Sequence, residues 1–259
     1  MGAILELVDV RKDFIKNDTV FTALENVNID FPEHSFISIV GPSGCGKTTI
    51  LRMCVGLLEA TSGQVLFHGK PLKGIHGQIG YVTQDHNLYP WMTLLDNVSF
   101  PLEARGVSRE ERYSRAREVI KMVGLEGFEH SYPVQLSGGM QKRGSIVRTL
   151  VYDPDVIMMD EPFGALDAQT RMILQQELLD LWSKRRKTII FITHDLAEAI
   201  SLSDRVIVMG KNPGRVMQVY DVPLPRPRDV FSIQETDEFH ETYQQIWRHF
   251  KDEMRSRKI

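Results

Sequence analysis

The chain has 259 residues, of which 42% are hydrophobic and 25% charged, as in one large globular domain or a domain with an insert. Its 34 acidic and 31 basic side chains give a net charge of −3, which argues against electrostatic binding to nucleic acid. No apolar run approaches the ~20 residues that cross a bilayer, no signal peptide is expected at the N-terminus, and Cys45 and Cys54 are too few for a disulfide framework.

Short apolar runs in the first part of the chain predict β-strands. Residues 4–8 are rich in Ile, Leu and Val, and residues 27–31 alternate apolar and polar side chains, which is the pattern of a half-buried strand. Residues 36–40 form an apolar run that predicts a buried strand, and this run ends at a glycine cluster.

The glycine cluster has the pattern of a phosphate-binding loop. Residues 41–48 match G-x-x-x-x-G-K-[ST] and lie between the buried strand and a run that can begin a helix. The glycines let backbone N–H groups turn towards phosphate oxygens, and the helix N-terminus favours an anion. We therefore expect Lys47 to reach the β- and γ-phosphates of a nucleotide and Thr48 to coordinate Mg²⁺. The residues expected to cradle the nucleotide are Gly41, Pro42, Ser43, Gly44, Cys45, Gly46, Lys47, Thr48 and Thr49.

The middle of the chain, residues 86–135, contains no buried-strand pattern. Ser108 and Glu111 have the spacing of a capping box, and Ala116 and Ile120 recur at helical spacing. We expect these residues to form a helical insert. The segments 1–85 and 136–210 on either side of it would then form the α/β core.

Three further apolar runs, residues 156–160, 189–192 and 206–209, predict buried strands that alternate with helices. This order favours a parallel sheet that is covered on both faces. The first of these strands ends in Asp160 and Glu161. In a nucleotide site Asp160 can hold Mg²⁺, and Glu161 can polarise the attacking water as a general base.

The composition changes after Gly210, and residues 211–259 are expected to form a C-terminal extension. Prolines alternate with Arg226 and Arg228 in a segment that predicts a solvated, extended linker. The last segment predicts an amphipathic helix that packs back on its own domain, with a contact to a second protomer as the alternative. The apolar residues of its stripe are Phe239, Tyr243, Ile246, Trp247, Phe250 and Met254.

Residues 136–141, Leu-Ser-Gly-Gly-Met-Gln, resemble the signature motif of the ATP-binding-cassette (ABC) ATPase family, and the resemblance extends in order over nearly the whole chain. It implies an α/β fold, with a P-loop (RecA-like) nucleotide-binding core, an N-terminal antiparallel β-subdomain and an inserted α-helical subdomain. Residues 41–48 correspond to the Walker A loop and residues 156–161 to Walker B. Gly144, inside the predicted helix after the signature, departs from the family pattern, and we attribute it to close packing of that helix.

The resemblance also implies roles for single residues. Phe14 lies where the family stacks an aromatic ring on adenine, and Gln84 lies where the Q-loop glutamine touches Mg²⁺ or the water. His194 corresponds to the switch histidine that bonds the γ-phosphate, and Asp167 belongs to the D-loop. The signature residues are Leu136, Ser137, Gly138, Gly139 and Met140.

A pair of cassettes is implied, formed with a second copy of the chain or with a paralogous cassette. Each ATP would lie between the Walker A loop of one cassette and the signature motif of the other, and would be hydrolysed to ADP and phosphate. The expected catalytic residues are Glu161, His194, Gln84 and Lys47, and the expected Mg²⁺ ligands are Thr48, Gln84 and Asp160.

Residues 85–98 and 161–167 resemble importers of the nitrate/sulfonate/taurine type. This implies an ATPase on the cytoplasmic face of the cell membrane that works with two transmembrane permease subunits and, indirectly, a solute-binding protein, but with no nucleic acid. The solute would be small and anionic, such as nitrate, a sulfonate, taurine or bicarbonate. A permease helix would dock in a groove lined by Leu88, Tyr89 and Trp91. The alternatives are the ATPase of an exporter or lipid transporter and a soluble cassette without a transport role.

Overall fold

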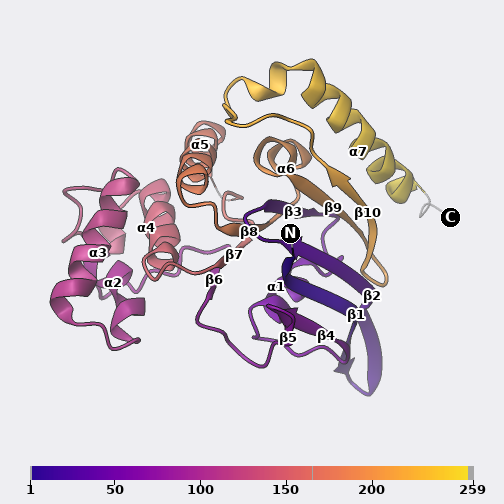
Figure 1. Cartoon of the computed structure of the whole chain (residues 1–259), viewed down its shortest axis with the longest axis horizontal. Coiled ribbons are helices and arrows are strands. Elements are labelled where there is room, and N and C mark those ends of the chain that lie inside the picture. The colour runs from indigo at the N-terminus through magenta and orange to yellow at the C-terminus, as the bar shows by residue number, and fades with distance from the viewer. Residues whose placement is uncertain (1, 165, 256–259) are drawn as a thin grey trace.

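A computed structural model describes residues 2–164 and 166–255 of the chain, without the side chains of residues 16, 185, 249, 250 and 252–255. Its elements form a central six-stranded sheet, a smaller four-stranded sheet and two groups of helices (Figure 1). Among the described residues, no helix is both long enough and apolar enough to span a bilayer.

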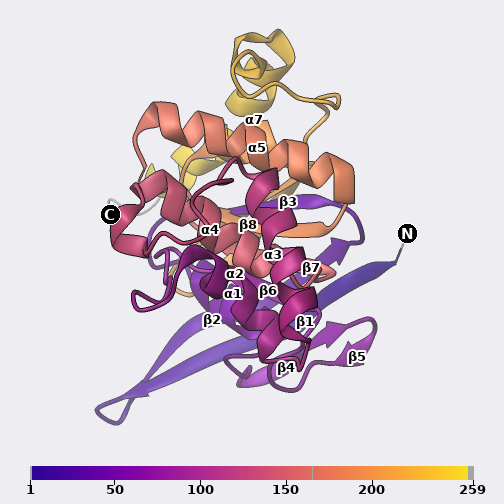
Figure 2. The ribbon, with the colours of Figure 1, turned by 90° about the vertical axis from the view of Figure 1, so that its left-hand side faces the viewer.

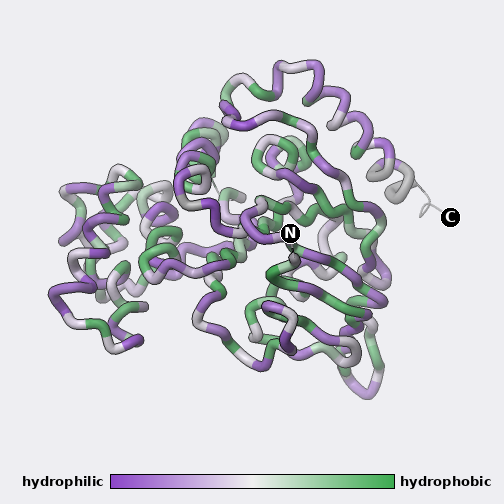
Figure 3. The backbone as a smooth tube through the Cα atoms, viewed as in Figure 1, coloured by the Kyte–Doolittle hydropathy of each residue, from purple (hydrophilic) through white to green (hydrophobic). Residues whose placement is uncertain are grey.

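The six-stranded sheet has the order β10-β9-β3-β8-β7-β6, and all its neighbours are parallel except β10 and β9. Every side chain of β3 and of β7 is buried, which agrees with the prediction of strands covered on both faces. Figure 3 shows hydrophobic residues concentrated along these central strands, whereas α7 at the rim is largely hydrophilic. The bounds are β3 Phe36–Val40, β6 Ile79–Val82, β7 Val156–Asp160, β8 Thr188–Thr193, β9 Arg205–Gly210 and β10 Arg215–Asp221.

The N-terminal sheet has the order β2-β1-β4-β5 and is antiparallel throughout. The long β1–β2 hairpin projects from the body of the molecule (Figure 2). Helix α1 lies between the two sheets, because its Ile50 and Leu51 share one buried cluster with Ile39 of β3 and Leu7 of β1. The bounds are β1 Ala3–Lys16, β2 Thr19–Pro32, α1 Lys47–Cys54, β4 Ser62–Phe67 and β5 Lys70–Pro71.

The insert is helical, as the sequence predicts. Ser108 caps α3 by accepting a hydrogen bond from the Glu111 amide, although the Glu111 carboxylate pairs with Arg115. Helix α2 packs on α3 and also on α4, so the helical unit continues past residue 135. The bounds are α2 Leu94–Glu103, α3 Arg109–Met122, the 3₁₀ turn η1 Pro133–Gln135 and α4 Gly138–Leu150.

Close packing accounts for the glycine in α4. A Cβ atom at Gly144 would lie 2.8 Å from Cδ1 of Leu94 and 3.4 Å from Cδ1 of Leu88. A larger side chain would therefore have to displace buried leucines of the insert.

The C-terminal extension packs against the core. Phe239 and Ile246 of α7 are buried in one cluster with Ala199 and Ile200 of α6, which confirms that the amphipathic helix folds back on its own chain. The predicted side chains of residues 250 and 254 lie outside the described part. The remaining bounds are α5 Ala168–Arg185, α6 Leu196–Leu202, the 3₁₀ turn η2 Ile233–Glu235 and α7 Asp237–Arg255.

The prediction that Arg226 and Arg228 are solvated is wrong. Arg228 is 5% exposed, and its guanidinium donates to carbonyl oxygens at the end of α6, including that of Ser203 at 2.7 Å. Arg226 donates to Asp204 at 2.7 Å and to the Leu202 carbonyl at 2.7 Å. The last carbonyl oxygens of a helix have no hydrogen-bond donor within the helix. Here two arginines from a distant segment donate to them.

Candidate functional site

Four neighbouring parallel strands carry the expected site at their carboxyl ends. In the order β3-β8-β7-β6, these strands lead into Gly41, His194, Glu161 and Gln84. The carboxyl ends of parallel strands meet at one edge of a sheet, where open α/β folds bind their ligands. Positions that are far apart in the sequence thus converge on one edge.

The phosphate-binding loop has a left-handed backbone at two of its glycines, Gly44 and Gly46. Gly44 has φ +79°, and no atom lies within 4 Å of the position its Cβ would take. Gly46 has φ +93° and precedes α1, which has no side-chain cap. The first N–H groups of α1 therefore remain available for an anion such as a phosphate.

Lys47 points back into this loop. Its side chain is nearly buried, and Nζ donates to the carbonyl oxygens of Gly41 at 2.8 Å and Pro42 at 3.3 Å. These neutral oxygens are weaker partners for an ammonium group than an anionic phosphate oxygen. The ammonium group of Lys47 therefore already lies at the loop, where a phosphate oxygen could replace the two carbonyl oxygens as its partner.

Asp160 and Thr48 meet although 112 residues separate them. Thr48 Oγ1 donates to Asp160 Oδ1 at 3.2 Å, and the Tyr81 hydroxyl donates to Asp160 Oδ2 at 3.4 Å. Burial raises the pKa of Asp160, whereas the Thr48 hydrogen bond opposes this rise. A hydroxyl and a carboxylate oxygen side by side are hard oxygen donors, so this pair fits Mg²⁺.

Glu161 and His194 form a second pair beside the first. His194 Nδ1 lies 3.1 Å from Glu161 Oε2, and the side chains are 62% and 24% exposed respectively. Glu161 has φ +42°, an uncommon left-handed conformation for this residue type, and its amide donates to the Ile192 carbonyl at 3.0 Å. Such a backbone persists only where its surroundings fix it, and it often marks a functional position.

Gln84 is exposed just beyond the end of β6, and its backbone carbonyl is held by a residue that the sequence analysis did not identify. Lys142 of α4 is fully buried, and its Nζ donates to the carbonyls of Thr83 at 2.9 Å and Gln84 at 3.1 Å. Burial lowers the pKa of Lys142 to about 8. A lysine in a helix usually indicates a solvated face, so the sequence carried no local signal for this contact.

The signature residues lie at the start of α4, at a distance from Lys47 of the same chain. Ser137 is the N-cap of α4 and accepts a hydrogen bond from the Met140 amide at 3.3 Å. Figure 1 shows α4 well separated from α1. Asp167 caps α5 in the same manner, and the hydrogen bonds from Thr170 lower its pKa. Residue 165 of the expected D-loop lies outside the described part.

Phe14 and Cys45 occupy contrasting positions. Phe14 lies on the projecting β1–β2 hairpin with 40% of its surface exposed, and Lys12 Nζ lies over its ring, 5.3 Å from the centroid. Cys45 is fully buried inside the loop, and this burial raises the pKa of its thiol. A buried thiol with a raised pKa carries little thiolate, which agrees with a space-filling role.

The three expected docking residues differ in exposure. Trp91 is 69% exposed, and its ring centroid lies 5.5 Å from that of Tyr89, which is half-buried. Asn97 fixes the loop that carries them, since its side chain bonds to both the amide and the carbonyl of Tyr89. Leu88 is buried close to Gly144, so the expectation that it lines a surface groove is corrected.

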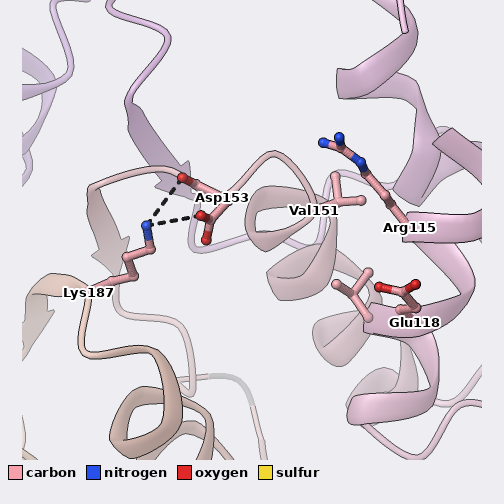
Figure 4. Close-up of a pocket in the computed structure, with 6 residues that line it drawn as sticks. Arg115, Glu118, Val151, Asp153 and Lys187 are labelled. Carbon is pink, nitrogen blue, oxygen red and sulfur yellow. Dashed lines mark hydrogen bonds and ion pairs between the residues drawn. The ribbon is translucent and has the colours of Figure 1, made fainter. Parts of the chain in front are cut away.

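A hollow of about 460 Å³ lies away from these residues, between α3 and the loop before β7 (Figure 4). Its cationic groups already have carboxylate partners, because Lys187 pairs with Asp153 at 3.2 Å and Arg115 pairs with Glu111. We assign no ligand to it. Its lining residues are Arg115, Glu118, Val119, Val151, Asp153 and Lys187.

Comparison with known proteins identifies the family to which the chain belongs. The ABC transporter family model matches residues 24–164. The chain is 50% identical to an ABC transporter ATP-binding protein of Methanocaldococcus jannaschii, over 98% of this chain and 94% of that protein. It is 38% identical to the aliphatic sulfonates import ATP-binding protein SsuB of Bacillus cereus, over 94% of each chain.

Solved structures show the same fold. The dimeric ATP-binding cassette MJ0796 in a post-hydrolysis state with ADP and phosphate is 35% identical, with a TM-score of 0.76 over 85% of this chain and 100% of that chain. The cassette cbiO1 of Clostridium perfringens, part of the ABC transporter complex cbiONQ, is 25% identical, with a TM-score of 0.77 over 97% of this chain and 98% of that chain. The fold, the converging strand ends and these relatives together show that the chain belongs to the ABC transporter family, as an ATP-binding cassette that hydrolyses ATP.

Proposed function

We propose that this cassette powers the import of a small anionic solute, with an aliphatic sulfonate as the first candidate and nitrate, taurine and bicarbonate as others. The observation that carries this proposal is the 38% identity to the sulfonate importer protein SsuB over 94% of the chain. The cassette would act at the cytoplasmic face of the cell membrane as a peripheral subunit.

Two cassettes, either two copies or this chain with a paralogous cassette, would close head to tail around ATP. Ser137 begins α4, whose N-terminal amides suit an anion, yet α4 lies apart from α1 in this chain (Figure 1). A partner cassette would bring its own signature motif to the phosphates held at Lys47. The dimeric structure of MJ0796 supports the pairing of two cassettes.

Within each composite site, Lys47 would exchange its two loop carbonyls for phosphate oxygens. Bound Mg²⁺, for which Thr48, Asp160 and Gln84 are the proposed ligands, would offset the negative charge of the phosphates. Glu161 would accept the proton of the attacking water as the water oxygen bonds to the γ-phosphorus. The bond between the γ-phosphorus and the bridging oxygen would then break, releasing ADP and phosphate.

His194 would sense the γ-phosphate. Its Nδ1 faces the Glu161 carboxylate, which can only accept a hydrogen bond, so Nε2 would donate to a phosphate oxygen in the imidazolium form, in which both ring nitrogens carry a proton. Binding there and loss after hydrolysis would shift the population of closed and open pairs.

The membrane contact is proposed at the loop before α2. Trp91 and Tyr89 present an aromatic surface beside the Q-loop, which is the segment 83–87 after β6. Exposed aromatic residues often anchor interfaces. Two transmembrane permease subunits would dock there, and a solute-binding protein would act from the other side of the membrane. The membership of cbiO1 in a transporter complex supports a partner of this kind.

A tagged full-length chain recovered from detergent-solubilised membranes tests the proposal. We expect polytopic subunits to be recovered with it, and Trp91→Ala to lower their yield by about tenfold or more. Phe128→Ala, which removes another exposed aromatic ring of the insert, is the matched control and should leave the yield unchanged.

Transport assays in vesicles that contain the recovered complex then separate the alternatives. ATP-dependent uptake of a sulfonate supports the proposal, whereas ATP-dependent movement of lipid or solute in the opposite direction favours an exporter. Recovery of the chain without any membrane subunit would favour a cassette with no transport role.

A further inference from the structure

Side chains of α4 hold the backbone of the Q-loop at several points. Lys142 Nζ donates to the carbonyls of Thr83 and Gln84, and Arg148 Nη1 donates to the Asn87 carbonyl at 2.6 Å. The two bonding residues lie on one helix, six positions apart. These hydrogen bonds join the Q-loop to α4, so a displacement of one segment would also move the other.

A buried lysine such as Lys142 costs more free energy than a purely structural contact requires. Its side chain is fully buried, and the two recorded acceptors of its ammonium group are neutral carbonyl oxygens. Burying a charge without an ionic partner costs free energy, and a neutral donor would fill the position at lower cost. Asp85 and Asp160 lie close enough to favour its charged form, so the ammonium sits in the field of the nucleotide site.

The same helix begins at the signature motif. Ser137 caps α4, and Lys142 follows it by little more than one turn. One short rigid segment thus connects the Gln84 carbonyl, beside one nucleotide site, with Ser137, which faces the other site in the proposed pair.

We propose that Lys142 is a positioning residue that couples Gln84 to the signature motif of the same chain. When Gln84 contacts one ATP, the resulting movement of the Q-loop would pass through Lys142 to α4. It would thereby shift Ser137, which contacts the second ATP in the proposed pair. This inference rests on the proposed roles of Gln84 and Ser137 and adds the physical link between them.

Steady-state ATPase kinetics of the full-length chain test the link. Lys142→Met should lower kcat about tenfold while KM stays within about twofold, because the phosphate loop is untouched. Lys142→Arg retains the charge and the donors and should restore kcat to within about threefold. Lys121→Met, on an exposed lysine of the insert, is the matched control and should behave as the parent.

A double-mutant cycle shows whether Lys142 acts through the Q-loop. In a Gln84→Ala background, Lys142→Met should change kcat by less than about twofold further, because the link then has nothing to transmit. Lys142→Leu, which also lacks a donor, provides the same comparison if the methionine variant folds poorly.

Three results would overturn the proposal: an unchanged kcat in Lys142→Met, an arginine variant as impaired as the methionine variant, or a loss that persists undiminished in the Gln84→Ala background. Failure to recover membrane subunits would refute the import role alone, since this kinetic test needs only the cassette.

Discussion

At the scale of single residues, Glu161 is the group that we propose as the general base for hydrolysis. Its backbone is held at φ +42° and its carboxylate lies 3.1 Å from His194. Glu161→Gln keeps the shape of the side chain but cannot accept a proton, so kcat should fall by roughly 10²–10⁴ while ATP affinity stays within about threefold. Phosphate release and equilibrium nucleotide binding measure the two quantities.

Glu110→Gln on α3 makes the same chemical change at an exposed position and should leave both quantities unchanged. A Glu161→Gln variant that hydrolyses ATP at more than about a third of the parental rate would contradict the assignment of the base.

Glu198 predicts a pH dependence of stability. It is buried, and burial raises its pKa above the usual 4.5, although Thr193 and Gln175 donate hydrogen bonds to it. A folded-state pKa above the unfolded one stabilises the protein at low pH, and this contribution is lost as pH rises through the folded-state pKa. The free energy of unfolding, measured relative to Glu198→Gln, should therefore fall as the pH rises from the ordinary value of 4.5 through the folded-state pKa.

Urea unfolding of the parent chain and of Glu198→Gln at each pH gives the difference between their free energies of unfolding. The contributions of all other titratable groups cancel in this difference. A difference that is constant over the range, or that increases with pH, would show that Glu198 is not perturbed by its burial.

At the scale of elements, the C-terminal extension stabilises the end of α6. Arg228 donates to the carbonyls of Ile200, Ser201, Ser203 and Leu224. Arg228→Met would leave buried carbonyls without partners, and should lower the free energy of unfolding by about 3 kcal/mol in urea titrations.

Arg215→Met on β10 removes an exposed guanidinium and should change the free energy by less than about 0.5 kcal/mol. A loss below about 1 kcal/mol in Arg228→Met would mean that water replaces the lost donors.

Elements with a strong local pattern could be predicted from the sequence, whereas contacts between distant segments could not. The runs 36–40 and 156–160 read as buried strands because every residue faces packed neighbours, and both strands are fully buried. Arg228 looked solvated because charged residues between prolines usually are, and its acceptors come from a helix about 25 residues earlier.

At the scale of the whole molecule, the motifs identified the strand ends that form the site, because each motif is local in sequence and parallel strands bring their carboxyl ends together. Local patterns could not reveal Lys142, whose role depends on how the insert docks on β6. They also could not reveal that Leu88 is buried while Trp91, three residues on, is exposed.

The central claim is that two cassettes close around ATP, with the Ser137 of one facing the phosphates at the Lys47 of the other. Light scattering of the Glu161→Gln chain in Mg²⁺ with ATP or ADP tests it most directly. We predict a shift from the mass of one chain in ADP to that of two chains in ATP, and no shift when Ser137→Glu is added, because a carboxylate would repel the phosphates. A Glu161→Gln chain that binds ATP yet remains single, even with its membrane subunits present, would contradict the account.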